Sequence, residues 1–292
     1  IDAPGYDDEY YWFWFNSSGE KYDNPNKTKK INGKSYAFDG FGAMQYEWYE
    51  GATITETSSL GWYNSADDGH LAKSEWIWAD ESDVLGIDDG DDHWFYADKH
   101  GELVTNDTKK INGKWYSFDD YGRMQWGLVW LAEESVKAEN NAVVRSEDPE
   151  DISADDVYAQ TEGYLHFFSN DEEKDGSMKT GASIKIEMYD DTYTFGFDKT
   201  SGAALHGVEK NKLYKNGILQ TASDNRYDYA KVDGKYYLVS SNGTRVKLTS
   251  RTYKDADDYY WFVAEGDDET GYTLYKATTA ADAKAKKGEE FK

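Results

Sequence analysis

Aromatic and polar residues alternate in a short unit that recurs along the chain. The stretch WYSFDDYGRM at 115–124 shows the pattern: aromatic side chains at alternate positions, a polar turn, a glycine and an aliphatic residue. Alternation followed by turn residues is typical of a β-hairpin. Similar units are WFWFNSSGEK (12–21), SYAFDGFGAM (35–44), WYNSADDGHL (62–71), WFYADKHGEL (94–103) and, in looser form, YWFVAEGDDETGYTL (260–274).

One of these hairpins occurs almost twice. NDTKKINGKWYSFDDYGRMQWG at 106–127 repeats NKTKKINGKSYAFDGFGAMQYE at 26–47. Units that recur every ~20 to 30 residues are typical of repeat architectures. Because a single two-stranded hairpin is marginally stable in water, we expect successive hairpins to stack and bury their rings against each other. Gly42 and Gly122 stand where such a turn needs a positive φ.

The pattern stops between about residue 131 and residue 162. The intervening stretch is acidic, nearly free of aromatic residues, and carries Pro149 in a run that favours a helix start. We therefore predict a mostly β fold of repeated hairpins, stacked as a solenoid-like array in two lobes with a short helical connector. The predicted parts are an N-terminal lobe at 1–131, an acidic connector with a short helix at 132–161, and a degenerate C-terminal lobe at 162–292.

Composition narrows the choice of partner. The chain has 292 residues and a net charge of -25, which disfavours nucleic acid and anionic membrane surfaces. It has no cysteine, and no run of 18 apolar residues, so we expect no thiolate chemistry and no membrane insertion. It also has 25 Tyr and 11 Trp with a mean hydropathy of -0.90. Not all of these rings can lie in a core, so an aromatic binding surface is expected.

The residues GKWYSFDDYGRMQWG at 113–127 resemble the cell-wall-binding repeats of Gram-positive surface proteins, a group that includes choline-binding modules and glucan-binding repeats. That resemblance implies a secreted or cell-wall-associated, non-catalytic module, part of a larger multi-domain protein, with ligand sites walled by rings. Choline-binding repeats place a Gly-Trp pair before the hairpin. Here the pair is kept only at Gly61-Trp62, and its counterparts are Glu47-Trp48, Gly127-Leu128 and Gly181-Ala182.

Catalytic motifs are not found in the sequence. The five histidines show no metal-ligand spacing, and neither a Gly-x-Ser-x-Gly elbow nor a P-loop occurs. We expect no enzyme and no cofactor. A weak calcium candidate is the acidic turn IDDGDDHW, whose possible ligands are Asp88, Asp89, Asp91 and Asp92.

Tryptophans outside the regular strand pattern, or variable between its copies, are the candidate ligand residues. Trp76 and Trp78 lie two apart and would share one face of a strand. The set is Trp48, Trp62, Trp76, Trp78, Trp115, Trp126 and Trp130.

The leading hypothesis is binding of a polysaccharide, an α-glucan such as starch, by aromatic stacking. One alternative is a cell-wall anchor that binds teichoic-acid choline or peptidoglycan glycan. Another is a structural or adhesin region without a small ligand.

Overall fold

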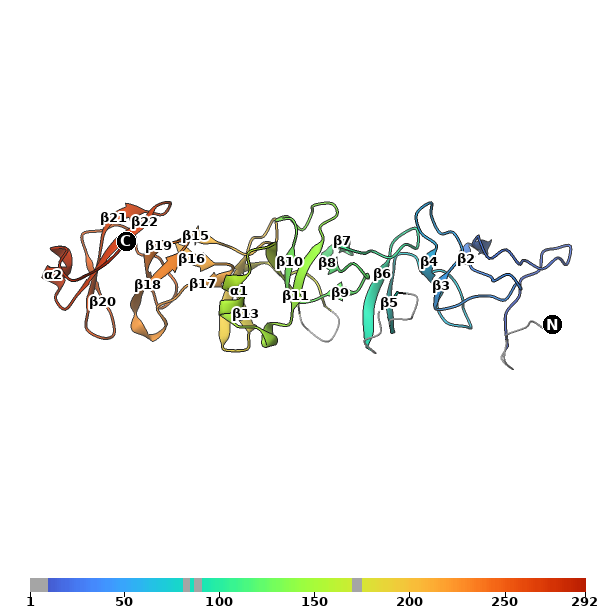
Figure 1. Ribbon diagram of the computed structural model, residues 1–292, viewed down its shortest axis with the longest axis horizontal. Coiled ribbons are helices and arrows are strands. Elements are labelled where there is room, and N and C mark those ends of the chain that lie inside the picture. The colour runs from blue at the N-terminus through green and yellow to red at the C-terminus, as the bar shows by residue number, and fades with distance from the viewer. Residues whose placement is uncertain (1–9, 81–84, 87–90, 170–174) are drawn as a thin grey trace. The chain divides into compact units, whose positions relative to one another are not determined.

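Short antiparallel hairpins make up most of the fold, which confirms the expected mostly β class. The computed structural model describes residues 10–80, 85–86, 91–169 and 175–292, and the chain divides into two units, Ile1–Gln125 and Trp126–Lys292 (Figure 1). The strands of the first unit are β1 (Lys29–Ile31), β2 (Lys34–Tyr36), β3 (Trp48–Glu50), β4 (Leu60–Trp62), β5 (Glu75–Asp80), β6 (Asp92–Ala97), β7 (Asp107–Ile111), β8 (Lys114–Phe118) and β9 (Met124–Gln125).

A repeated turn follows the aromatic strand of many hairpins. In the turn after β8, Asp119 Oδ1 accepts hydrogen bonds from the backbone N–H groups of Tyr121 and Arg123. Gly122, three residues after the aspartate, has a φ of 91°, as the sequence pattern predicts. Asp39, Asp98 and Asp198 accept the same kind of bonds from the N–H groups that follow them. The recurrent Asp or Asn is therefore a turn-forming residue.

Each hairpin of the first unit packs on the next one along the chain. Trp48 and Trp62 of β3 and β4 lie on Phe95 of β6, with a Trp48–Phe95 centroid distance of 5.2 Å. On the opposite face of β5 and β6, Trp76 lies 4.9 Å from the ring of Tyr116 in β8. The rings therefore form the core between neighbouring hairpins, as the stacking argument predicts.

The second unit contains larger sheets. Its strand orders are β11-β10-β12, β13-β14-β17-β16-β15, β18-β19 and β20-β21-β22-β23. The strands are β10 (Gly127–Leu131), β11 (Val143–Glu147), β12 (Tyr164–Phe168), β13 (Gly181–Glu187), β14 (Thr192–Phe197), β15 (Gly207–Glu209), β16 (Lys212–Lys215), β17 (Ile218–Leu219), β18 (Tyr227–Val232), β19 (Lys235–Ser240), β20 (Thr252–Lys254), β21 (Tyr260–Asp267), β22 (Gly271–Ala277) and β23 (Glu289–Phe291).

The segment 132–161 is built into the second unit. It contributes β11, which pairs with β10, and the helix α1 (Ala154–Ala159), whose Val157 lies in the same core as Trp130. Pro149 begins a 3₁₀ turn, η1 (Pro149–Asp151), and α1 starts later, where Ser153 and Asp156 form a capping box. The remaining helical elements are η2 (Ser223–Asn225) and α2 (Ala280–Lys284). Across the described ranges, no helix has the length and apolarity that crossing a membrane requires.

The turn aspartates give the fold a pH dependence. Hydrogen bonds from the backbone N–H groups of Ser201 and Thr200 hold the pKa of Asp198 below its usual value. Because the unfolded pKa is about 3.9, this carboxylate stabilises the fold above about pH 4, and the contribution is lost as the pH falls through the lower folded pKa.

We expect Asp198→Asn to reduce the difference in unfolding free energy between about pH 6 and about pH 3, measured by urea titration. The control is Asp224→Asn, because Asp224 is exposed and accepts no hydrogen bond from the described residues. An equal reduction in both variants would show that general charge, and not the turn, sets the acid sensitivity.

Candidate functional site

The β5–β6 hairpin carries four aromatic rings on one face. Its register pairs Trp76 with Tyr96 and Trp78 with Trp94. Because side chains alternate between the faces of a strand, these four rings share one face. The opposite face consists of the buried side chains Ile77, Ala79, Phe95 and Ala97.

Only one end of this aromatic face is open. Trp76 is half-buried between the rings of Tyr96, at 5.2 Å, and Tyr116, at 4.9 Å. Trp78 is 52% exposed, and its ring centroid lies 5.0 Å from that of Trp94 with 49° between the planes. The part of this face that a ligand can reach is therefore the Trp78–Trp94 pair, whereas Trp76 is covered by Tyr96 and Tyr116.

Carboxylates flank the open pair. Asp80 and Asp92 pair two positions further along the ladder, beyond the Ala79–His93 pair, so they lie on the same face as the indoles. Both residues are exposed. Two carboxylates beside two indoles favour a cation, since each ring face attracts positive charge and the acids add to the attraction.

Trp48 and Trp62 occupy the other side of the same hairpin. They pair across β3 and β4, with centroids 5.0 Å apart in a T-shaped arrangement. Trp48 Nε1 donates a hydrogen bond of 3.0 Å to the carbonyl oxygen of Asp80. Both rings are half-buried against Ile77 and Phe95, so they connect two hairpins.

The other candidate tryptophans belong to other parts of the fold. Trp115 is half-buried in β8, and Trp126, just before β10, is 43% exposed. Trp130 is 3% exposed in the core of the second unit, with the guanidinium of Arg145 5.4 Å from its ring centroid. Of the seven candidate tryptophans, Trp78 and Trp126 are the two whose indole rings are exposed enough for a ligand to stack on.

Trp94 and Asp80 were not among the residues that the sequence analysis selects, and Asp92 was selected only as a possible calcium ligand. Trp94 belongs to the repeating unit WFYADKHGEL and so resembles a core position. The missing information is the hairpin register, which places Trp94 directly opposite Trp78. Aligning SEWIWAD (74–80) against DDHWFYA (91–97) about the intervening turn could have suggested this pairing.

Histidine and acidic clusters add no second site. His166 is fully buried, with Nδ1 2.8 Å from the carbonyl oxygen of Tyr164, and burial lowers its pKa. Of the calcium candidates, Asp88 and Asp89 lie outside the described residues. Within the described part of the chain, no group of three or more His, Cys, Asp or Glu side chains could hold a metal ion. Calcium binding at this turn stays a prediction.

Comparison with known proteins gives matches in structure. No protein-family model and no curated protein match the sequence. Choline binding protein F from Streptococcus pneumoniae is 20% identical, with 90% of this chain and 75% of that chain covered and a TM-score of 0.46. CbpJ from the same organism is 17% identical, with 88% and 86% covered and a TM-score of 0.44. Alternansucrase in complex with isomaltononaose is 13% identical, with 92% and 17% covered and a TM-score of 0.28.

Proposed function

We propose that the chain is a non-catalytic module that attaches its protein to the bacterial cell wall by binding a choline-type quaternary ammonium group. The observation that carries this proposal is the open Trp78–Trp94 pair with Asp80 and Asp92 on the same face. The module would act outside the cell as part of a larger protein, with a choline-bearing wall polymer as its partner.

The chemistry of the pair suits this ligand. A quaternary ammonium has no N–H group to donate, so it needs ring faces more than hydrogen-bond acceptors, and each well-placed indole contributes about 0.5 to 2 kcal/mol. The nearby carboxylates add attraction that a neutral ligand would not feel. With two rings in the pair, we expect weak binding by a single site. Choline is named in the description of a similar structure, so it is the first ligand to test.

Glucan binding is the second candidate function. Trp78 and Trp126 are 52% and 43% exposed, so each offers an indole face to the apolar side of a pyranose ring. An α-glucan binds by stacking on such faces without a charge of its own. It would therefore be insensitive to the carboxylates of Asp80 and Asp92, which separates it from choline.

The test is a titration of the full chain with choline in moderate salt, in which tryptophan fluorescence or NMR measures binding. We expect Trp78→Ala to weaken choline binding by about 2- to 30-fold, because it removes half of the ring pair. The neutral isostere 3,3-dimethylbutanol should bind far more weakly than choline. Trp12→Ala is the matched control, since Trp12 is 60% exposed and lies outside the β5–β6 hairpin.

Each other result has a defined meaning. Binding of maltoheptaose but not of choline, lost in Trp78→Ala or Trp126→Ala, would replace the proposal with the glucan function. Equal binding of choline and its neutral isostere would show that the positive charge of the ligand does not contribute to binding. Binding of neither ligand class by the wild-type chain would contradict both functions.

A further inference from the structure

A basic segment interrupts this acidic chain. Residues 234–254 contain five Lys or Arg and no Asp or Glu, whereas the whole chain has a net charge of -25. The segment covers β19, the following turn and β20, all within the second unit. A basic segment in a strongly acidic protein requires a structural explanation. Its Lys and Arg side chains would have carboxylates to pair with almost anywhere else in the chain.

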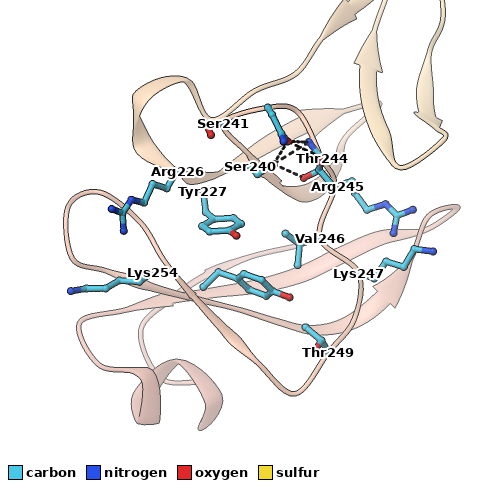
Figure 2. Close-up of a pocket in the computed structure, with 12 residues that line it drawn as sticks. Arg226, Tyr227, Ser240, Ser241, Thr244, Arg245, Val246, Lys247, Thr249 and Lys254 are labelled. Atoms are coloured by element: carbon cyan, nitrogen blue, oxygen red, sulfur yellow. Dashed lines mark hydrogen bonds between the residues drawn. The ribbon is translucent and has the colours of Figure 1, made fainter. Parts of the chain in front are cut away.

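Three of these cations, Arg245, Lys247 and Lys254, line one pocket together with Arg226 from an earlier part of the chain. Its volume is about 770 Å³, in the range of small-molecule sites. Figure 2 shows Arg226 and Lys254 on one side of Tyr227, and Arg245 and Lys247 on the other. A ligand in the pocket would therefore have positive charge on both sides of it.

Ion pairs neutralise only two of the four cations. Lys254 Nζ lies 2.5 Å from Asp258 Oδ1, and Arg245 Nη2 lies 2.7 Å from Asp268 Oδ2. Arg226 and Lys247 are exposed, and neither side chain forms an ion pair with any residue that the structure describes. Two positive charges on the pocket lining are thus left uncompensated.

Arg245 places a buried guanidinium at the wall of the pocket. Its side chain is 2% exposed, and Nε and Nη1 are buried without a hydrogen-bond partner among the described residues. A guanidinium keeps its positive charge even in a protein interior. Because Nε and Nη1 are buried, Arg245 contributes positive charge behind the pocket wall and not a donor that a ligand can reach.

The pocket also offers surfaces that suit a sugar ring. Tyr227 and Tyr253 are half-buried, with ring centroids 5.0 Å apart. The turn from Ser240 to Thr244 is held by its own bonds, including 3.1 Å from Thr244 N to Ser240 Oγ. The hydroxyl of Ser241, which lines the pocket, is not used in that turn. Aromatic faces beside hydroxyl groups and cations suit a saccharide that carries a negative charge.

We propose that this pocket is a second binding site, which takes an anionic saccharide and holds its phosphate or carboxylate between Arg226 and the Arg245–Lys247 side while a sugar ring packs on the tyrosines. The site uses residues of the second unit only. It does not depend on the Trp78–Trp94 pair, so its failure and the failure of choline binding are separate results.

The test is calorimetric titration of the full chain with glucose 1-phosphate, glucuronate and glucose. We expect both anions to bind in low salt, with affinity that falls as sodium chloride is raised, and glucose to bind far more weakly. Arg226→Gln and Lys247→Gln should each weaken the binding of the anions by about tenfold. A preference for glucose 1-phosphate over glucuronate would identify phosphate as the better group, and the reverse order would identify carboxylate.

The control is Lys231→Gln. Lys231 lies in β18 with its Nζ 4.8 Å from the ring of Tyr236, and it does not line the pocket. Its removal changes the net charge by the same amount as Arg226→Gln. If the control weakens binding as much as the pocket variants, or if glucose binds as well as its phosphate, the proposed site is wrong. The same holds if neither anion binds at millimolar concentration.

Discussion

Replacing Trp261 by alanine is expected to destabilise the second unit by about 3 to 5 kcal/mol. Trp261 is 0% exposed and packs in one core with Val263 and Leu274. Its Nε1 donates a 3.0 Å hydrogen bond to Asp255 Oδ2, and Asp255 is itself 1% exposed. The substitution therefore opens a large cavity and also removes a donor from a buried carboxylate.

Trp261→Phe separates these two causes. Phenylalanine keeps most of the volume but has no N–H, so the expected loss is smaller, about 1 to 3 kcal/mol. The measurement is hydrogen exchange of amides in β21 and β22, which reports on this core directly, together with denaturant unfolding. An alanine variant within about 0.5 kcal/mol of the wild-type chain would contradict the assigned role.

Asp119→Ala is expected to cost about 2 to 3 kcal/mol in the first unit. The Asp119 carboxylate accepts from two turn amides, from Arg123 Nε at 2.7 Å and from Gln125 Nε2 at 3.1 Å. Asp119 is 8% exposed, so water replaces these bonds poorly.

Asp120 provides the control for that turn. It is the next residue, is exposed, and accepts no hydrogen bond from the described residues, so Asp120→Ala should change the unfolding free energy by less than about 0.5 kcal/mol. Chemical denaturation followed by circular dichroism measures both variants. Equal losses of stability in the two variants would mean that the removal of a negative charge causes the loss. The hydrogen bonds of the Asp119 carboxylate would then not be what stabilises the turn.

The hairpins could be predicted from the sequence because their determinants are local. Alternating rings and an Asp-x-x-Gly turn lie within about ten residues, and the turn bonds of Asp119 connect neighbours only. The sequence also indicated a helix after Pro149. The helix begins at Ala154, five residues later, because Ser153 and Asp156 form the capping box.

The exposure of individual tryptophans was less predictable. Trp76 and Trp78 are two residues apart in one strand and share a face, yet Trp76 packs on Tyr116 whereas Trp78 is 52% exposed. Tyr116 is forty residues further along the chain, so the difference depends on how one hairpin meets the next. The burial of Trp130 could not be predicted for the same reason, because the core around it also includes Val157 of α1, which is distant in the sequence. Periodicity identifies the face of a strand but not which neighbour covers it.

The register of the β5–β6 hairpin has a mechanical consequence. Both chain ends leave the hairpin beside the Glu75–Ala97 pair, at the end opposite the Asp80–Asp92 pair. Tension along the chain would load the ladder one pair at a time, as in unzipping, and would not shear all pairs together. Once Trp76 is pulled away from Tyr116, few bonds resist each further step. We therefore expect the module to lengthen at low force, releasing one hairpin after another and so absorbing extension while other hairpins stay folded.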